Sequence, residues 1–381
     1  MSRVSSRDPF FQRRSEWAKY KHAILGRYLH VWVYKLASRS DELAFVDTCA
    51  GEGTYDDGEL GSPLLAARWN DDYLNAKGKR LVVYACEPRP ASFEKLRLNL
   101  DPYLTRNPPQ AVVMNERFED ALPDLLEATR HVPTLIFIDP YGMKDLTAEK
   151  LAPLLKDKGR EPTELIVRVP PQLIRRFVGW LKKKERDARG KKTAASFRRL
   201  LDELHLDTEA LAQSLEEDPD HGVNIHELLY DYLKLFTMRL SYVQAIPVRP
   251  NYYATPKYYL VHGTDSSHGI AHMNDIVSKA EDDLFKETYM AQERGQLSLF
   301  DLPQRIVRAR IKDAEQMILE YLEQVGEAGY IDIRAQLALR FGPDLRAKDH
   351  NKALKNLEGK KISRIDKGGR IEHSRYRLIS S

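Results

Sequence analysis

Short apolar runs alternate with amphipathic stretches over the first 170 residues, and this alternation constrains the fold more than any other feature. The apolar runs cover residues 43–46, 81–86, 111–114, 134–138 and 164–169. Strands of this length separated by helices predict a doubly wound, mostly parallel sheet. An amphipathic helix over residues 16–37 precedes the first strand.

Two further apolar stretches extend the pattern beyond the fifth strand. Residues 242–246 and 258–261 flank a turn-rich loop and predict an antiparallel hairpin. Five parallel strands followed by such a hairpin are typical of class I methyltransferases rather than of dehydrogenases. The predicted fold class is therefore α/β, with a Rossmann-like domain of the class I methyltransferase type.

The domain plan has three parts. A Rossmann-like methyltransferase domain covers 1–289, with an insertion at about 175–225, and a linker without periodicity covers 290–306. Residues 307–381 hold three helical stretches and a terminal hairpin with the turn Lys367-Gly368-Gly369. Three helices followed by a glycine-turn hairpin predict a C-terminal winged-helix domain.

The loop after the first strand predicts a nucleotide cofactor. It reads Asp47-Thr48-Cys49-Ala50-Gly51-Glu52-Gly53. Gly51 and Gly53 let the backbone approach a ligand at the carboxyl end of the strand, and Asp47 is a partner for the amino group of a methionine moiety. Glu87, at the end of the second strand, is the expected acceptor for ribose hydroxyls. We therefore predict S-adenosylmethionine as the cofactor, with Ala50 in the binding loop.

The fourth strand ends in Asp139-Pro140-Tyr141-Gly142. In methyltransferases that act on exocyclic amines of bases, Asp or Asn followed by Pro and an aromatic residue stands at this position. The carboxylate and a backbone carbonyl accept the amine hydrogens, and the ring stacks on a flipped or single-stranded base. Asp139, Pro140 and Tyr141 are the predicted catalytic residues, and Asp139 also faces the cofactor. The alternative is a simple strand-ending turn.

Several motifs together resemble one known family, the three-Cys-motif partner family. The resemblance covers roughly residues 15–279 and rests on Lys21-His22, the loop 47–53, Gly61-Ser62-Pro63, the segment 137–142 and Tyr258-Tyr259-Leu260. It implies a methyltransferase-like protein whose partner is a separate three-cysteine protein resembling radical-SAM enzymes. The present chain has two scattered cysteines, so it corresponds to the partner of that cysteine protein.

Two pairs of predicted cofactor contacts come from comparison with methyltransferase families. The Lys21-His22 pair resembles one in an rRNA adenine-N6 methyltransferase family, where the pair lies near the cofactor. Asn115 and Phe118 stand where methyltransferases often have Asp-Phe beside the adenine, so the sequence Asn115-Glu116-Arg117-Phe118 departs from that pattern.

Basic residues are concentrated in two regions and predict contact with nucleic acid. Residues 175–199 hold eleven Lys or Arg against two acidic residues, and residues 342–381 hold eleven against five. The alternative for the first region is a solvated arm, and the alternative for the second is a protein-binding module. The predicted contacts are Arg175, Arg176, Lys182, Lys183, Lys184, Lys352, Lys355, Arg364, Lys367 and Arg370.

The linker contains a pentapeptide that matches the consensus by which bacterial proteins bind the replication sliding clamp. It reads Gln296-Leu297-Ser298-Leu299-Phe300, and we predict clamp contacts through Gln296, Leu297, Leu299 and Phe300. The alternative is an apolar latch that folds back onto the parent domain.

Composition excludes several other classes. The net charge of +4 is small, and two cysteines do not support a disulfide framework or a cysteine zinc site. No apolar run is long enough for a membrane span, so a cytoplasmic protein is expected. His262, Asp265, His268 and His272 follow an edge strand in a Gly-Ser loop without a recognisable supporting pattern, so no metal site is predicted.

Two functions remain open at this stage. One is a methyltransferase-like enzyme that uses S-adenosylmethionine to modify a base amine in DNA or RNA, together with the three-cysteine partner. The other is an accessory subunit for DNA repair or defence that binds nucleic acid and recruits that partner without methylating anything. The clamp peptide favours DNA, whereas Asp139-Pro140-Tyr141-Gly142 resembles a tRNA methyltransferase motif and favours RNA.

Overall fold

The computed structural model describes residues 16–55, 57–140, 161–169, 240–292, 310–365 and 371–379. The chain forms two compact units. The first comprises Met1–Leu240, Ala245–Pro250 and Thr255–Val261, and the second comprises Ser241–Gln244, Asn251–Ala254 and His262–Ser381.

A seven-stranded sheet forms the centre of the first unit, with the strand order β3-β2-β1-β4-β5-β7-β6. The pairs β1–β2, β1–β4, β2–β3 and β4–β5 are parallel. The α/β, Rossmann-like fold predicted from the alternating apolar runs is thereby confirmed. The strands are β1 Glu42–Asp47, β2 Arg80–Cys86, β3 Ala111–Met114, β4 Thr134–Ile138, β5 Thr163–Val169, β6 Tyr242–Val248 and β7 Tyr258–Thr264.

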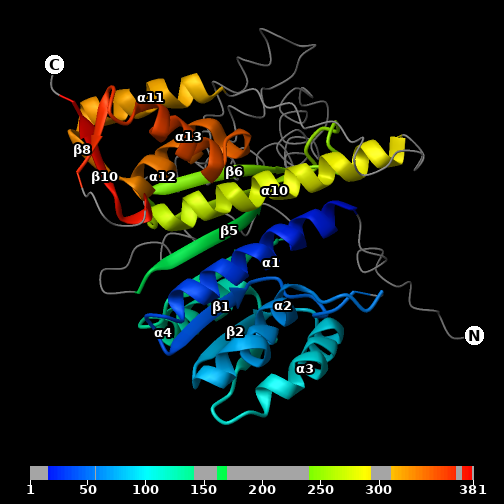
Figure 1. The fold of residues 1–381 in the computed structure, drawn as a ribbon. Coiled ribbons are helices and arrows are strands. Elements are labelled where there is room, and N and C mark those ends of the chain that lie inside the picture. Colours follow the sequence, from blue (N-terminus) through cyan, green and yellow to red (C-terminus); the bar gives the residue numbers. More distant parts are fainter. Residues whose placement is uncertain are drawn as a thin grey trace, which may run out of the picture. The chain divides into compact units, whose positions relative to one another are not determined.

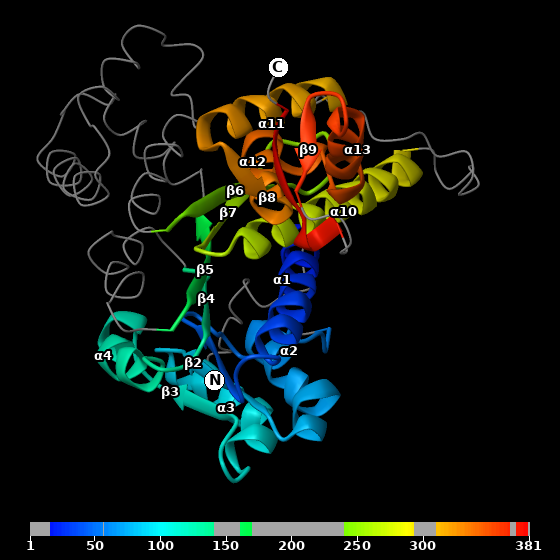
Figure 2. The ribbon, with the colours of Figure 1, turned by 60° about the vertical axis from the view of Figure 1, so that its left-hand side comes forward.

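Helices cover both faces of the parallel strands (Figures 1 and 2). Figure 2 shows α4 on one side of these strands and α1 and α2 on the other. Strands with helices on both faces must be apolar on both faces, and every residue of β4 is buried. The helices are α1 Glu16–Leu36, α2 Ser62–Trp69, α3 Pro90–Leu104 and α4 Phe118–Ala128.

The parallel register brings the carboxyl ends of the central strands to one edge of the sheet. Asp47, the last residue of β1, lies opposite Ala85 of β2 and Phe137 of β4. The residues that directly follow these strands therefore lie close together, as ligand-binding residues do in open α/β sheets.

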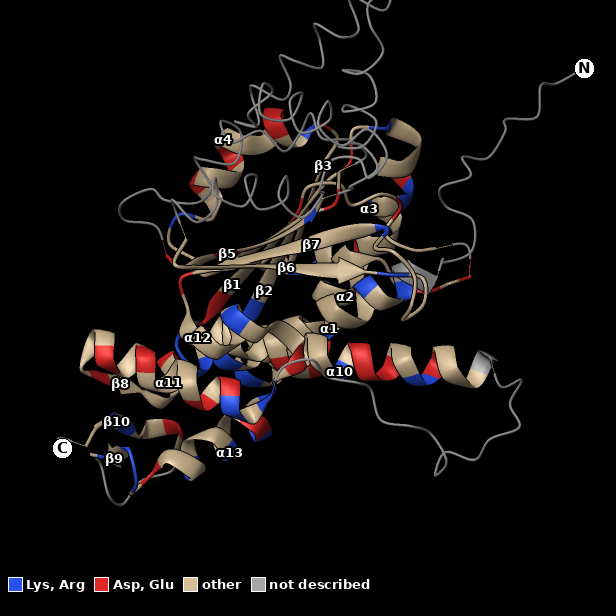
Figure 3. Ribbon diagram, turned by 90° about the horizontal axis from the view of Figure 1, so that it is seen from above, with Lys and Arg blue, Asp and Glu red and all other residues tan. Residues whose placement is uncertain are grey.

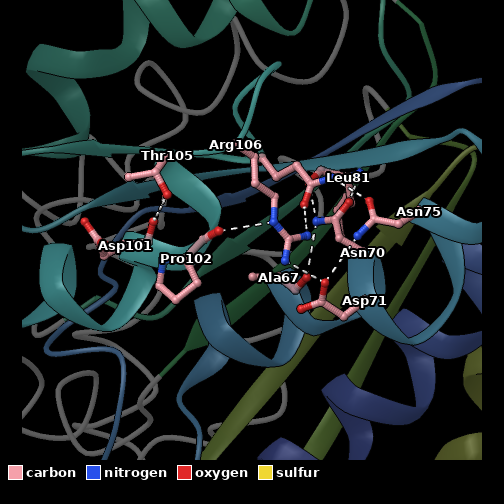
Figure 4. Close-up of polar contacts among 10 residues, drawn as sticks. Ala67, Asn70, Asp71, Asn75, Leu81, Asp101, Pro102, Thr105 and Arg106 are labelled. Atoms are coloured by element: carbon pink, nitrogen blue, oxygen red, sulfur yellow. Dashed lines mark hydrogen bonds and ion pairs between the residues drawn. The ribbon is translucent and has the colours of Figure 1, made fainter.

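A polar network near the start of β2 fixes the end of α2 (Figure 4). The helix continues into a π-helical turn, η2 Asn70–Leu74, and a short 3₁₀ turn, η3 Asn75–Lys77. The buried Asn70 side chain donates to the carbonyl of Leu81 and accepts from its N–H, both at 2.8 Å. Arg106 donates to Asp71 at 2.7 Å. These bonds satisfy backbone groups of an internal strand, so the network stabilises the fold.

The described residues of the second unit form four α-helices and a small antiparallel sheet with the order β8-β10-β9. Its core includes Ile318, Leu322, Leu337, Leu354 and Tyr376. The helix α10 and the strand β8 have no counterpart among the elements predicted from the sequence. The elements are α10 Ser267–Gln292, α11 Ile311–Val325, β8 Glu327–Gly329, α12 Tyr330–Phe341, η5 Gly342–Asp344, α13 Ala347–Leu357, β9 Ile362–Arg364, η6 Ile371–His373 and β10 Arg375–Leu378.

Within the described part of the chain, no helix combines the length and apolar character required to cross a bilayer.

Candidate functional site

A cavity of about 420 Å³ opens at the carboxyl edge of the sheet in the first unit. Its size lies in the range of cavities that hold small molecules and cofactors. The residues around it directly follow β1 and β2, begin α4 or end β4. They are Thr48, Cys49, Glu87, Pro88, Arg89, Arg117, Phe118, Glu119 and Ile138.

Glu87 combines complete burial with an unused acceptor. Its Oε1 accepts hydrogen bonds from the N–H and the Nε of Arg89, each at 3.0 Å. Its Oε2 is buried and has no hydrogen-bond partner in the part of the chain that the structure describes. A buried carboxylate oxygen without a donor costs free energy, so this atom is the best-supported ligand contact in the cavity.

Asp47 is also fully buried and lies directly before two lining residues. Its Oδ1 accepts from the N–H of Cys49 at 3.1 Å, whereas its buried Oδ2 meets no donor in hydrogen-bond geometry. Burial raises the pKa of Asp47 to about 6, and this rise is opposed first by the Ser62 hydroxyl and then by the Cys49 N–H, which both hydrogen-bond to the carboxylate. Asp47 is therefore mostly ionised at neutral pH and would gain from a cationic partner.

Glycines shape the loop between β1 and α2. Gly51 has a φ of +62°, a left-handed conformation that L side chains rarely adopt. Gly61 N–H donates to the carbonyl of Gly53 at 2.7 Å, and a Cβ at Gly61 would lie 2.7 Å from that same oxygen. The loop therefore depends on glycine for its backbone conformation and for a close backbone approach.

Asp139, which follows β4, is held between two cations. Its Oδ2 accepts from the Nζ of Lys21 on α1, and its Oδ1 accepts from the Nη1 of Arg168 on β5 at 3.1 Å. The same Arg168 nitrogen donates to the carbonyl of Pro140 at 3.3 Å, and its guanidinium lies 4.8 Å from the ring centroid of Tyr258. Both carboxylate oxygens and the neighbouring carbonyl are therefore already engaged.

The charges in this cluster control one another's protonation. Burial alone would raise the pKa of Asp139, but Lys21 and Arg168 outweigh burial and lower it to about 2. Burial is the largest single influence on the pKa of Lys21 and lowers it, but the charge of Asp139, together with Tyr258, Tyr55 and the hydrogen bond to Asp139, outweighs burial and raises this pKa. The cluster therefore contains two cations and one anion at neutral pH, and its net charge is positive before Asp47 is counted.

The remaining predicted cofactor residues have the following positions. The Nε2 of His22 lies 2.9 Å from the hydroxyl oxygen of Tyr55. Ala50 is buried, and its N–H donates to the carbonyl of Cys86. Phe118 lines the cavity, whereas Asn115 donates its amide to the carbonyl of Glu87 at 2.9 Å. Asn115 therefore positions the Glu87 backbone in this structure and is not among the lining residues.

Some predicted site residues lie outside the described residues. They are Tyr141, the insertion residues Arg175, Arg176, Lys182, Lys183 and Lys184, the clamp peptide Gln296, Leu297, Leu299 and Phe300, and the turn residues Lys367 and Arg370. Of the predicted nucleic-acid contacts, the structure describes Lys352 and Lys355, both exposed on α13, and the half-buried Arg364 on β9.

Arg168 is a site residue that the sequence pattern did not predict. Its position could have indicated a role, since Arg168 is a cation inside the otherwise apolar end of the fifth strand. A charged side chain in a buried strand needs a partner. Among the described residues, no group of three or more His, Cys, Asp or Glu side chains is placed to hold a metal ion.

Comparisons with known proteins return distant structural likenesses. No protein-family model matches the chain, and no curated protein matches it. A candidate methyltransferase from Escherichia coli is 19% identical, covering 38% of this chain and 70% of its own, with a TM-score of 0.24. A Legionella pneumophila protein is 13% identical over 75% of this chain and 95% of its own, with a TM-score of 0.37. A candidate class I S-adenosylmethionine-dependent methyltransferase from Listeria monocytogenes is 9% identical over 68% and 63%, with a TM-score of 0.31.

Proposed function

We propose that the first unit binds S-adenosylmethionine in the cavity at the carboxyl edge of its sheet. The observation that carries the proposal is the buried Oε2 of Glu87, which has no hydrogen-bond partner among the described residues. Asp47, at the end of the adjacent strand, adds a second buried carboxylate, whose Oδ2 meets no donor in hydrogen-bond geometry in that part of the chain. A ribose supplies hydroxyl donors for Glu87, and the amino group of a methionine moiety supplies a cation for Asp47. Phe118 and Ile138 provide the apolar lining that an adenine ring needs.

S-adenosylmethionine would supply an electrophilic methyl group for transfer. We propose a methyltransferase-like protein that acts on a base amine of nucleic acid, with Asp139 and Pro140 as acceptors that orient the amine and Tyr141 as the stacking ring. For this role Arg168 must share Oδ1 of Asp139 and the Pro140 carbonyl with the amine, or release them, when the base enters, because it bonds to both.

The engagement of Asp139 by two cations favours a second candidate function. If Lys21 and Arg168 keep both carboxylate oxygens, an amine would have to share oxygens that two cations already hold, which makes this position a weaker acceptor. The protein would then be an accessory subunit that binds nucleic acid, and S-adenosylmethionine as well, without methylating. It would deliver a three-cysteine radical-SAM-like partner to its target.

Other parts of the proposal concern partners. The chain order in the second unit is α11, β8, α12, α13, β9 and β10, and the three strands form the sheet β8-β10-β9. This order is typical of a winged helix, and we propose that these elements form a winged-helix domain. The pentapeptide at residues 296–300 is proposed as a sliding-clamp ligand. Both proposals are compatible with either candidate function.

Titration calorimetry with S-adenosylmethionine and with S-adenosylhomocysteine tests the cofactor proposal. We expect one site per chain for each ligand. Folded protein that produces no binding heat at high ligand concentration contradicts the proposal. A second assay, transfer of labelled methyl groups to DNA and RNA with and without the three-cysteine partner, separates the candidates. Transfer supports the enzyme, whereas cofactor binding without transfer under any condition supports the accessory subunit.

The raised pKa of Asp47 predicts that cofactor affinity depends on pH. Because burial raises this pKa to about 6, acidification below that value neutralises the carboxylate that would attract the amino group. We expect affinity for S-adenosylmethionine to fall roughly tenfold between pH 7 and pH 5, since one pKa unit corresponds to a factor of ten in the ionised fraction. Methylthioadenosine lacks the amino acid moiety and serves as the matched control. Equal pH dependence for both ligands would show that Asp47 does not bind the amino group.

A further inference from the structure

Three exposed lysines lie on one face of α13. Lys348, Lys352 and Lys355 are four and three residues apart, so they form one stripe along the helix, and all three are exposed. The opposite face carries His350, Ala353, Leu354 and Leu357, which are buried. Among the described residues, none of the three lysines forms an ion pair. The stripe is about 10 Å long at 1.5 Å per residue.

The two amide side chains beside this stripe are already engaged. Asn351 Oδ1 accepts from the hydroxyl of Tyr330 at 2.7 Å, and Asn356 Nδ2 donates to Glu315 on α11 at 2.6 Å. Reading an adenine through asparagine requires both the amide oxygen and the amide nitrogen. Each of these residues already uses one of the two atoms in a bond to the protein, so the paired contact would require that atom to be shared.

Three acidic residues lie near the stripe, and the exposed Glu358 is the residue that caps the end of α13. Glu315 accepts the Asn356 bond, and Asp349 accepts from the N–H of Arg346, which caps the start of α13. Figure 3 marks the Lys and Arg residues of this unit in blue and its Asp and Glu residues in red. The residues after α13 add further exposed cations, Lys360 and Lys361.

We infer that the exposed face of α13 binds the phosphate backbone of B-form duplex DNA without reading base sequence, an inference that rests on the proposed nucleic-acid substrate. Lysine binds phosphate as a point charge on a flexible stem and lacks the planar, rigid fork of arginine. The major groove of B-DNA is about 12 Å wide and admits a helix, whereas that of A-form RNA is too narrow and deep. The second unit therefore holds the duplex in place and leaves the choice of target base to the first unit.

Fluorescence anisotropy with the full chain, without cofactor, tests the inference. The probes are two DNA duplexes of equal length and unrelated sequence and an RNA duplex of the same length, each at several salt concentrations. We expect the DNA affinities to agree within about threefold and RNA to bind more weakly. Replacing Lys348, Lys352 and Lys355 by alanine removes about three phosphate contacts, so the slope of log affinity against log salt becomes shallower by about 2.7. Between 50 and 200 mM salt, the wild type then loses about 40-fold more affinity than the variant.

A charge-matched control separates local contact from total charge. Lys35, Lys286 and Lys312 are exposed on other helices, and their triple alanine variant loses the same charge. We expect its slope to match the wild type. Alanine is a strong helix former, so α13 is retained. If melting curves show that the α13 variant does not fold, the single variant Lys352→Ala is used, with an expected change of about 0.9.

The following results would contradict the inference that α13 binds duplex DNA. An unchanged slope in the α13 variant, equal slopes in both triple variants, a strong preference for one DNA sequence, or tighter binding to RNA overturns the inference. Calorimetry with S-adenosylmethionine on the same samples is independent of it. Cofactor binding without duplex binding therefore refutes only this inference, and duplex binding without cofactor binding refutes only the cofactor proposal.

Discussion

Replacing Asp139 by asparagine is expected to lower the free energy of unfolding by about 3–5 kcal/mol, because the change leaves two cations without a counter-charge. The side chains of Lys21 and Asp139 are 9% and 15% exposed, so water screens the pair poorly. Arg168 loses the same partner. The measurement is urea unfolding of wild type and variant, followed by tryptophan fluorescence at neutral pH.

Two further variants make the Asp139 experiment specific. Adding Lys21→Met to the asparagine variant removes one unpaired ammonium and should restore part of the lost stability. Asp71→Asn is the matched control, because Asp71 and Arg106 form a more exposed pair at 2.7 Å, and exposed pairs contribute about 1 kcal/mol or less. If Asp139→Asn loses no more stability than Asp71→Asn, then Asp139 is not the electrostatic centre of a buried cluster.

The pairing of Asp139 with Lys21 and Arg168 also determines the pH range in which Asp139 stabilises the folded state. The pKa of Asp139 is about 2 in the folded chain, below its ordinary value of 3.8. A depressed carboxyl pKa stabilises the folded state fully above the unfolded value, and the contribution is lost as pH falls toward 2. The stability gap between wild type and Asp139→Asn should therefore narrow on acidification below about pH 4.

The parallel strands of the first unit could be predicted because their apolar sequence runs match the burial that the finished sheet imposes on them. The run at residues 43–46 is strongly apolar, is followed by a loop with two positive-φ glycines, and becomes the central strand β1. A buried parallel strand must be apolar on both faces, so its pattern is visible without knowledge of its neighbours. Glu87 could be placed for the same reason, since it directly follows the next apolar strand.

Other features depend on contacts between distant residues, which a sequence pattern does not encode. Asp139 was predicted to accept hydrogens from a substrate, but its two partners come from α1 and β5, 118 positions before it and 29 after it. The role of Asn115 depends on a bond to a backbone carbonyl 28 residues away. The π-helical turn at Asn70–Leu74 depends on the pairing of Asn70 with Leu81. In each case the tertiary partner, rather than the local pattern, determines what the side chain does.

Replacing Glu87 by alanine is expected to weaken S-adenosylmethionine binding by about a hundredfold or more. The carboxylate is fully buried beside the cavity, and its Oε2 has no partner among the residues that the structure describes, so a bound ribose would provide its missing donors. Hydrogen bonds to a charged group contribute about 1.5–3 kcal/mol each, and 1.4 kcal/mol corresponds to tenfold in affinity. Two such bonds therefore account for a hundredfold loss. The measurement is titration calorimetry with S-adenosylmethionine at neutral pH.

The control must separate the loss of a ligand contact from a general change in charge or fold. Glu94 on α3 is an exposed carboxylate paired with Arg97, so Glu94→Ala removes the same charge away from the cavity and should keep wild-type affinity. Glu87→Gln retains an acceptor for Arg89 but loses the negative charge, so its affinity should fall between those of wild type and Glu87→Ala. That ordering is specific for a carboxylate that accepts from the ligand. If Glu87→Ala instead binds as tightly as Glu94→Ala while both remain folded, the ribose is not held at Glu87, and the unpartnered oxygen must serve a different ligand.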